Sequence, residues 1–237
     1  MRMEITYIGH SGFLAETEQA LLLFDYYQGE IPPLADTKPL YVFASHRHGD
    51  HFNPQVFDLA KEHPEICFVF SRDIWRSRVP EEVQDKLVSL KPRQQWQDGR
   101  LQVTTLKSTD EGVAFLVEIE GMTIYHAGDL NDWRWEGEPE GWNRQMQENY
   151  RKNLEVLRGR RIDAAFVPLD PRQEKDYCLG MDYFLETACP RKVFPMHCWE
   201  DYGIIDRWFA EHPDSPFRDC VVKIGGRGER FTVEAEA

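Results

Sequence analysis

The segment 46–51, which reads HRHGDH, constrains this chain more than any other feature. It follows directly on the apolar run Leu40–Ala44, which has the composition of a buried strand. In an extended segment alternate side chains point to the same side, so His46 and His48 can converge on one cation. The chain is therefore predicted to contain a buried strand that ends in a metal-binding loop.

The second half of this segment can face another cation. Gly49 lets the backbone turn freely, so Asp50 and His51 can point away from the first two histidines. Neutral imidazole and carboxylate are ligands that zinc, iron and manganese take in proteins. A solvated loop that is rich in histidine by chance is the alternative. Three histidines and an aspartate at this spacing favour the metal site.

The rest of the chain is predicted to combine short strands with helices. Asn53-Pro54 is typical of a helix start, and His63-Pro64 ends that helix because a residue before proline avoids the helical region. Since no internal repeat or long linker is visible, we expect an α/β fold in one domain that spans residues 1–237. Strands are expected at 5–8, 13–15, 20–24, 40–44, 66–70, 101–106, 113–119, 122–125, 162–167, 193–196, 221–224 and 231–233, and further helices at 141–158, 181–188 and 204–211.

The charge of the chain argues against a nucleic-acid partner. The formal net charge is −13, and the nearest thing to a basic stripe is a short cluster of Arg158, Arg160 and Arg161. Proteins that bind a polyanion usually neutralise its phosphates with many basic side chains. We therefore interpret the arginine cluster as the solvated end of a helix.

Cysteine usage and hydropathy indicate a cytoplasmic protein. The five cysteines are odd in number and include no Cys-x-x-Cys pair, which fits reduced thiols better than disulfides. No apolar run approaches the roughly 20 residues that cross a bilayer. The N-terminus turns straight into a strand-like pattern and lacks a signal-peptide core. We therefore expect no membrane partner.

The spacing His-x-His-x-Asp-His resembles the hallmark of the metallo-β-lactamase superfamily. Residues 7–13, which read YIGHSGF, resemble the opening strand and turn of its lactonase-like branch, which includes ascorbate-6-phosphate lactonase. Residues 126–129, HAGD, and 195–197, PMH, resemble the segments that hold the last ligands of that family. The resemblance covers most of the chain and implies a metallo-β-lactamase-like four-layer αββα sandwich.

The resemblance also implies a ligand set. Asp129 is expected to bridge two metals. Asp25, which closes an apolar strand, matches the aspartate that supports the histidine loop from behind. The ligands are expected to be His46, His48 and a third histidine for one metal, and Asp50, His51 and His197 for the other.

The third histidine is absent from this sequence. The loop that usually holds it reads STDEG at residues 108–112. Asp110 can replace it with an oxygen ligand or can cap the turn, and Glu111 is a weaker substitute. An oxygen ligand shifts the preference from zinc toward manganese or iron(II). We expect one or two Zn²⁺ ions, with Mn²⁺ or Fe²⁺ as alternatives, and a single metal if nothing replaces the histidine.

Other residues near these motifs have two possible roles each. His10 can lie beside the metals or serve as a hydrogen-bonded structural histidine. His126 is expected to support the ligands or the core, because ligating carboxylates need hydrogen-bond partners. Cys198 is expected to be a small buried residue. His63 and His212 each precede a proline at a helix end and are expected on the surface.

The segment after the HAGD motif is rich in tryptophan. Core packing is the ordinary role of Trp133, Trp135 and Trp142, but three tryptophans in ten residues beside a predicted metal loop indicate a pocket wall or lid. Cations in loops that could flank the same cleft and hold a carboxylate or phosphate, or could simply lie on the surface, are Arg134, Arg172 and Lys175.

These observations predict a metal-dependent hydrolase of a small ester, lactone, amide or phosphodiester. Coordination can lower the pKa of a bound water to about 7, and Asp50 would orient the resulting hydroxide. Two other classes stay open: a metal-binding protein of the same fold without turnover, and a nuclease of the superfamily. We expect a small-molecule substrate, and the resemblance to the lactonase-like branch suggests self-association into a homo-oligomer.

Overall fold

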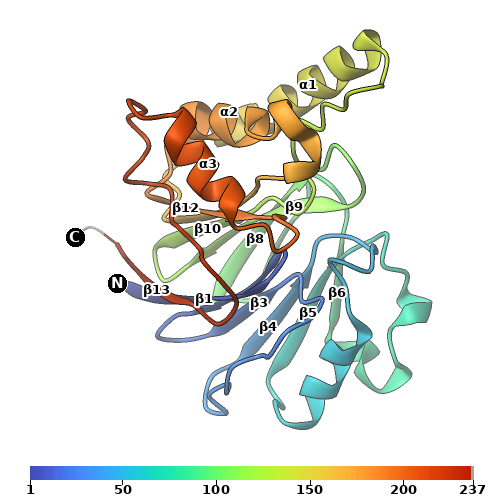
Figure 1. The fold of residues 1–237 in the computed structure, drawn as a ribbon. Helices are drawn as coiled ribbons and strands as arrows, with labels where there is room; N and C mark the ends of the chain where they lie inside the picture. Colours follow the sequence, from blue (N-terminus) through green and yellow to red (C-terminus); the bar gives the residue numbers. More distant parts are fainter. Residues whose placement is uncertain (236–237) are drawn as a thin grey trace.

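The computed structural model describes residues 1–235, and two stacked β-sheets form its centre (Figure 1). Within these residues one sheet has seven strands in the order β13-β1-β2-β3-β4-β5-β6, and the other has six in the order β12-β11-β10-β9-β8-β7. The strands of the first sheet are β1 (Arg2–Gly9), β2 (Gly12–Glu16), β3 (Leu21–Phe24), β4 (Leu40–Ala44), β5 (Ile66–Ser71), β6 (Leu87–Leu90) and β13 (Arg230–Glu234). Those of the second are β7 (Gln95–Gln97), β8 (Leu101–Lys107), β9 (Val113–Ile119), β10 (Met122–His126), β11 (Ala164–Pro168) and β12 (Lys192–Met196).

Helices lie outside both sheets and complete the four layers. The α-helices α1 (Glu140–Leu154), α2 (Leu179–Ala188) and α3 (Gly203–Glu211) cover the outer face of the six-stranded sheet (Figure 1). The 3₁₀ segments η1 (Pro54–Lys61) and η3 (Glu81–Lys86) contribute the apolar side chains that pack on the outer face of the seven-stranded sheet. The predicted αββα arrangement is thus confirmed, with 3₁₀ turns in place of α-helices in one outer layer. The shorter 3₁₀ segments are η2 (Arg76–Arg78), η4 (Glu155–Leu157) and η5 (Pro171–Asp176).

The apolar sequence of the strands accounts for the layering. Side chains alternate along a strand, so Leu22 and Phe24 of β3 enter the core between the sheets while Leu21 and Leu23 enter the outer core. Between the sheets the Phe13 ring stacks on that of Phe166, with 4.2 Å between the ring centroids. A strand that is buried on both faces must read as a continuous apolar run, as β3 does.

The β3-β4-β5-β6 part of the first sheet is parallel, as is β10-β11-β12 of the second. The carboxyl ends of parallel strands meet at one edge of a sheet. The loops that follow β4, β10, β11 and β12 therefore gather at one end of the molecule, where the candidate site lies.

The predicted strands at 40–44 and 113–119 agree with the structure residue for residue. The predicted strand 221–224 is wrong: among its residues only Val221 forms a bridge, an isolated one with Val193, and the chain then bends at Gly226 and turns at residues 227–228. The helix predicted after Asn53 is η1, and the Asn53 side chain caps it as expected by accepting a hydrogen bond from the Gln55 N–H at 2.9 Å.

Within residues 1–235, every helix falls short of the length and apolar character that a bilayer crossing requires.

Candidate metal centre

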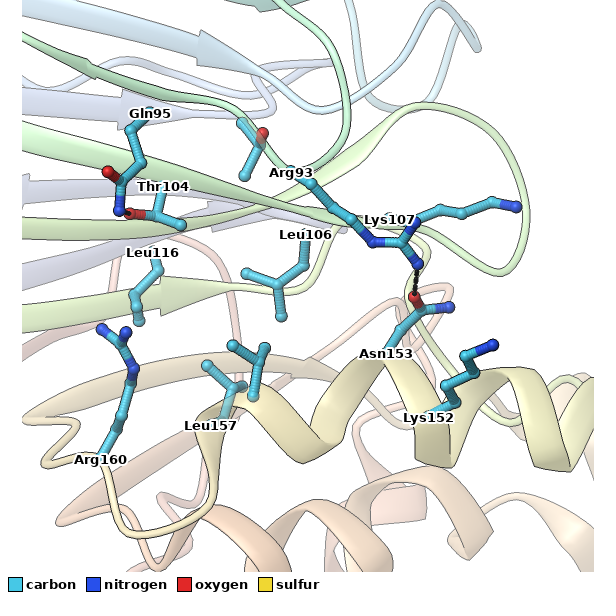
Figure 2. A pocket seen from close by; sticks show the side chains of 12 residues that line it. Arg93, Gln95, Thr104, Leu106, Lys107, Leu116, Lys152, Asn153, Leu157 and Arg160 are labelled. Atoms are coloured by element: carbon cyan, nitrogen blue, oxygen red, sulfur yellow. Dashed lines mark hydrogen bonds between the residues drawn. The ribbon is translucent and has the colours of Figure 1, made fainter.

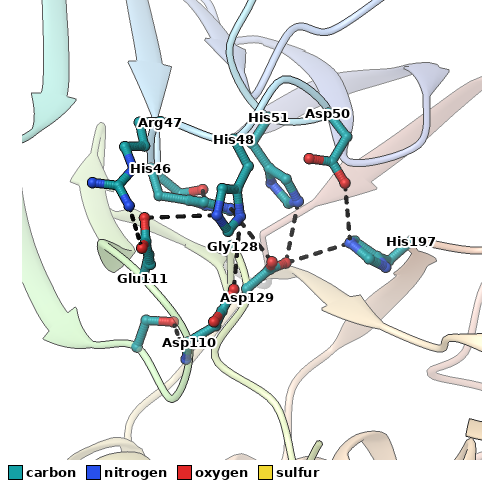
Figure 3. A network of polar contacts seen from close by, with 12 residues as sticks. His46, Arg47, His48, Asp50, His51, Asp110, Glu111, Gly128, Asp129 and His197 are labelled. Carbon is teal, nitrogen blue, oxygen red and sulfur yellow. Dashed lines mark hydrogen bonds and ion pairs between the residues drawn. The ribbon is translucent and has the colours of Figure 1, made fainter. Parts of the chain in front are cut away.

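Segments far apart in the sequence meet at one end of the two sheets. Segment 46–51 follows β4, and residues 108–112 connect β8 to β9. Asp129 lies just after β10, His197 just after β12, and His10 in the turn between β1 and β2. Figure 3 shows imidazoles and carboxylates from four of these segments directed toward one another.

The first set of possible ligands consists of His46, His48, Asp110 and Asp129, which we call the His46 group. One side-chain atom of each lies within 4.8 Å of the others. His46 Nε2 is 3.0 Å from His48 Nδ1, and His48 Nδ1 is 3.7 Å from Asp110 Oδ2. The structure therefore brings Asp110 beside His48, as its expected role in place of the missing histidine requires. Glu111 is also near, with Oε2 at 3.6 Å from His48 Nε2, but its other oxygen pairs with Arg47.

The second set consists of His10, Asp50, His51 and His197, which we call the His10 group. Its ligand atoms also lie within 4.8 Å of one another. Asp50 Oδ2 is 3.5 Å from His10 Nε2 and 3.9 Å from His197 Nε2. His10 thus stands among the possible ligands themselves, rather than behind them.

Asp129 lies between the two groups. Its Oδ2 is 3.4 Å from His46 Nε2, while its Oδ1 is 3.1 Å from His51 Nε2 and 3.5 Å from His197 Nε2. Each carboxylate oxygen therefore faces a different group. This is the arrangement that a bridging carboxylate requires.

Unpaired buried atoms test whether these residues suit a cation. Among the described residues, the Nε2 atoms of His10, His51 and His197 and the Oδ1 atom of Asp129 are buried and make no hydrogen bond. His51 Nε2 and His197 Nε2 face Asp129 Oδ1 at 3.1 and 3.5 Å, and His10 Nε2 faces Asp50 Oδ2 at 3.5 Å. Four such atoms around one small space fit a cation, and a set of imidazoles and carboxylates fits zinc, manganese or iron.

Buried carboxylates orient two of these histidines from behind. Asp25 accepts hydrogen bonds from the Ser45 N–H at 2.7 Å, from the Ser45 hydroxyl at 2.6 Å and from His51 Nδ1 at 2.7 Å. Asp170 accepts one from His197 Nδ1 at 2.8 Å. A proton held on Nδ1 leaves the Nε2 lone pair free for a metal.

Unusual backbone angles orient several of the possible ligands toward the centre. His10 and His197 both have left-handed backbone angles, with φ of 53° and 64°, and the His197 N–H donates to the His10 carbonyl at 3.2 Å. Non-glycine residues rarely adopt such angles, and they cluster at functional sites. Gly112, at φ 70°, packs so tightly on the Ser45 carbonyl that a Cβ would lie 2.0 Å from that oxygen. Only glycine allows the Asp110 loop to approach segment 46–51.

The charges of the centre shift the pKa values of its members. Burial opposes ionisation of Asp129, but the charges of His51 and His197 outweigh it and hold the pKa of that carboxyl well below its usual range. Burial and the charge of His51 lower the pKa of His46 to about 4. Burial and the charge of Asp129 raise the pKa of Asp110. At neutral pH His46 is therefore neutral and Asp129 ionised, which are the forms that bind metal.

A cavity of about 320 Å³ opens over both groups. Trp133, Trp135 and Trp142 line it, together with Arg172 and Met146. The Trp133 and Trp135 rings are parallel, with 5.8 Å between their centroids. The predicted tryptophan wall is therefore present in the structure, with α1 supplying Trp142 and Met146.

Comparisons with known proteins agree with this geometry. The sequence profile of the beta-lactamase superfamily domain matches residues 4–134, which is more than half of the chain. The chain belongs to the β-lactamase superfamily. A curated superfamily relative, the UPF0173 metal-dependent hydrolase of Desulforamulus reducens, is 30% identical over 215 residues, which cover 82% of this chain and 84% of that protein.

Further relatives carry similar names. A metal-dependent hydrolase of Heliobacterium modesticaldum is 26% identical over 224 residues, with 86% of each chain covered. The fold is that of the metallo-β-lactamase fold protein of Bacillus subtilis, with a TM-score of 0.63 at 15% identity over 98% of this chain and 99% of that one. The chain therefore stands among the metal-dependent hydrolases of the β-lactamase superfamily.

Some residues lie elsewhere than predicted. His63 is buried, not on the surface, because its N–H still bonds the Leu59 carbonyl at 2.9 Å and holds it against the end of η1. His212 is half-buried, because its ring stacks on Trp208 with 4.9 Å between centroids. Arg134 and Lys175 do not line the cavity: their ion-pair partners, Glu140 and Asp176 for Arg134 and Glu136 for Lys175, hold them outside it.

His126 and Cys198 are buried, as expected. His126 lies behind the ligands, where its Nδ1 accepts the Gly128 N–H at 3.1 Å and its Nε2 bonds the Ser11 carbonyl at 2.9 Å. Sequence reasoning missed Asp170, although it shows the same signal as Asp25. Both are single carboxylates directly after an apolar run, and Asp170 also precedes a proline at a 3₁₀ start.

Proposed function

We propose that this protein hydrolyses a small substrate with two divalent cations, one in each group, and with Asp129 shared between them. The observation that supports this most strongly is the set of unpaired buried atoms on His10, His51, His197 and Asp129. The approach of Asp110 to His48 supports a second cation in the His46 group.

The donor atoms of the two groups differ. With Asp129 shared, the His10 group offers three imidazoles and two carboxylates, a set that suits zinc. The His46 group offers two imidazoles and two carboxylates, and its larger share of oxygen donors favours manganese or iron(II) relative to zinc. We therefore propose Zn²⁺ in the His10 group, and Zn²⁺, Mn²⁺ or Fe²⁺ in the His46 group.

Cations bound there would acidify water and polarise the electrophile of the substrate. The chain itself supplies a carboxylate that can orient this water. Asp50 lies at the cavity, and although burial opposes its ionisation, His10, whose Nε2 is 3.5 Å from Asp50 Oδ2, and the charge of His51 lower its pKa below the usual range. Asp50 is therefore ionised at neutral pH. We propose that it orients the attacking water.

The cavity favours a compact substrate with an apolar part. Its volume of about 320 Å³ is at the small end of ligand pockets, and tryptophans form one wall. Arg172 is already paired with Asp170 at 2.5 Å and lies over the Trp199 ring, 4.5 Å from its centroid. Its charge is thus largely satisfied. We propose a small ester, lactone, amide or phosphodiester, with lactones first because YIGHSGF resembles the lactonase-like branch.

Metal content and turnover test this proposal together. Protein purified without chelator would be analysed for metals and assayed with Zn²⁺ or Mn²⁺ on lactones, esters, amides, phosphodiesters and single-stranded RNA. We expect turnover of a small substrate, lost in His48→Ala and Asp129→Ala and kept in Asp58→Ala, a surface control. Full metal loading without turnover on any substrate would instead favour a metal-binding protein. Cleavage of RNA alone would favour a nuclease.

A further inference from the structure

A second cavity lies away from the metal centre, between the sheet and the end of α1. Its volume is about 490 Å³, and its walls come from β8, β9, α1 and η4 (Figure 2). Leu106, Leu116 and Leu157 line it and are almost completely buried. Val156, on the same wall, is 52% exposed although it is apolar. The apolar part of the lining is aliphatic, and no aromatic ring lines the cavity.

Four cations line this cavity, and no carboxylate does. They are Arg93, Lys107, Lys152 and Arg160, in a chain whose net charge is −13. Figure 2 shows Arg93, Lys107 and Lys152 toward one end and Arg160 at the other. The arginine cluster that the sequence suggested was a solvated helix end thus contributes one residue, Arg160, to a cavity wall.

The charges of this wall are only weakly compensated. Arg93 donates to the Asn153 side-chain oxygen at 3.2 Å, which is a neutral partner. Arg160 Nη1 is 3.9 Å from Glu118 Oε1, too far for a hydrogen bond. Within residues 1–235, Lys107 and Lys152 form no ion pair. Like charges repel one another, so an anion between them would be favoured.

We propose that this cavity binds an organic anion with an aliphatic chain and a carboxylate or phosphate head. The head lies among Arg93, Lys107 and Lys152, where charge-assisted hydrogen bonds are available. The chain lies over the leucines at 106, 116 and 157 and over Val156. An aliphatic floor offers no ring on which a nucleotide base could stack, which separates this ligand class from nucleotides. The volume lies within the range of small-molecule sites.

Binding of octanoate, octyl phosphate, octanol and inorganic phosphate, each below any micellar concentration, tests this proposal. Titrations would follow methyl resonances of metal-loaded protein labelled at Val, Leu and Met methyl groups. We expect octanoate, octyl phosphate or both to shift the methyl resonances of Val156 and Leu106. Met146 reports on the metal cavity, so shifts confined to Met146 would overturn the proposal. If octanol or inorganic phosphate bound as tightly as octanoate and octyl phosphate, the proposal that the ligand needs both an anionic head and an aliphatic chain would be wrong.

Variants locate the site. We expect the pair Lys107→Gln and Lys152→Gln to weaken binding by about tenfold or more, because each substitution removes one charge-assisted hydrogen bond to the anionic head. Val156→Asp, at an exposed position, is expected to weaken the same ligand without disturbing the core. Lys61→Gln with Lys223→Gln is the matched control, since both lysines are exposed and lie outside this cavity. Unchanged affinity in both test variants would contradict the proposal.

Discussion

The two ligand groups share Asp129 but differ in how the fold supports them. In the His10 group, His51 is completely buried and His197 nearly so, and a buried carboxylate holds each from behind. In the His46 group, the side chains of His48 and Asp110 are 42% and 46% exposed. Support from behind fixes the orientation and the protonation of an imidazole before a metal arrives. We therefore expect the His10 group to bind metal more tightly than the His46 group.

Removal of the shared carboxylate should have the largest effect. Asp129→Ala takes one ligand from each group at once, so we expect both metals to be lost and turnover to fall below detection. Elemental analysis and activity measure this, with Asp58→Ala as the control. An Asp129→Ala protein that kept full metal content would show that Asp129 is not shared.

Changes at Asp110 should affect only the His46 group. Asp110→Ala removes one of its ligands, and we expect metal affinity there to fall by about a hundredfold or more, the upper end of what loss of a supporting partner costs. Asp110→His should restore binding and shift the preference from manganese toward zinc. Titration calorimetry with each metal measures both variants. If Asp110→Ala left both binding steps unchanged, Asp110 would only cap its turn.

Loss of the hydrogen bond from His197 to Asp170 should weaken metal binding by the His10 group, by a smaller factor than loss of a ligand. In Asp170→Asn the amide oxygen accepts the hydrogen bond from His197 Nδ1 less strongly than the carboxylate does, and we expect metal affinity to fall about 10–100-fold. Arg172→Gln is the matched control, because it breaks the ion pair with Asp170 and leaves His197 in contact with that carboxylate. Equal losses in the two variants would assign the effect to the ion pair instead.

In metal-free protein, acid should change the free energy of unfolding in opposite directions through His46 and through His51. The folded pKa of His46 is lowered to about 4, so its unfolded form binds a proton first, and stability falls as the pH drops below about 6.5, by up to roughly 3 kcal/mol. The pKa of His51 is raised despite burial, because Asp129 and Asp25 attract its proton. The stability that protonated His51 gives the folded protein is complete below about pH 6.5 and is lost as the pH rises through the folded pKa of His51.

Urea unfolding of chelator-treated protein across this pH range measures the two contributions. His46→Gln should flatten the loss of stability in acid, and His51→Gln should steepen it. The same change of slope in both variants would contradict these opposite assignments.

The sequence predicted the parts of the centre that are close together along the chain. Segment 46–51 carries its ligands within one loop, and residues 126–129 and 195–197 could be aligned with known motifs. Asp110 was the suggested replacement for the missing histidine, and the structure does place it beside His48. Whether it binds a metal stays a prediction.

The parts that were missed depend on tertiary packing. His10 was left with two possible roles, because the left-handed turn and the hydrogen bond from His197 that place it beside the other possible ligands are not visible in the sequence. The strands β6 and β7 lie at sheet edges, where β6 has only four residues and β7 has three that are mostly polar, so neither was predicted. His63 is buried although its neighbours Lys61, Glu62 and Glu65 are charged.

Helix α1 has a consequence for how the two cavities relate. Its early turns place Trp142 and Met146 at the metal cavity, and its final turn places Lys152 and Asn153 at the aliphatic one. The two ends of this span are about 15 Å apart, since a helix rises about 1.5 Å per residue. A rigid helix that slides along its axis or shifts sideways as a whole moves both ends together. Such a shift of α1 at Lys152 would therefore also reshape the space available to a substrate at Trp142.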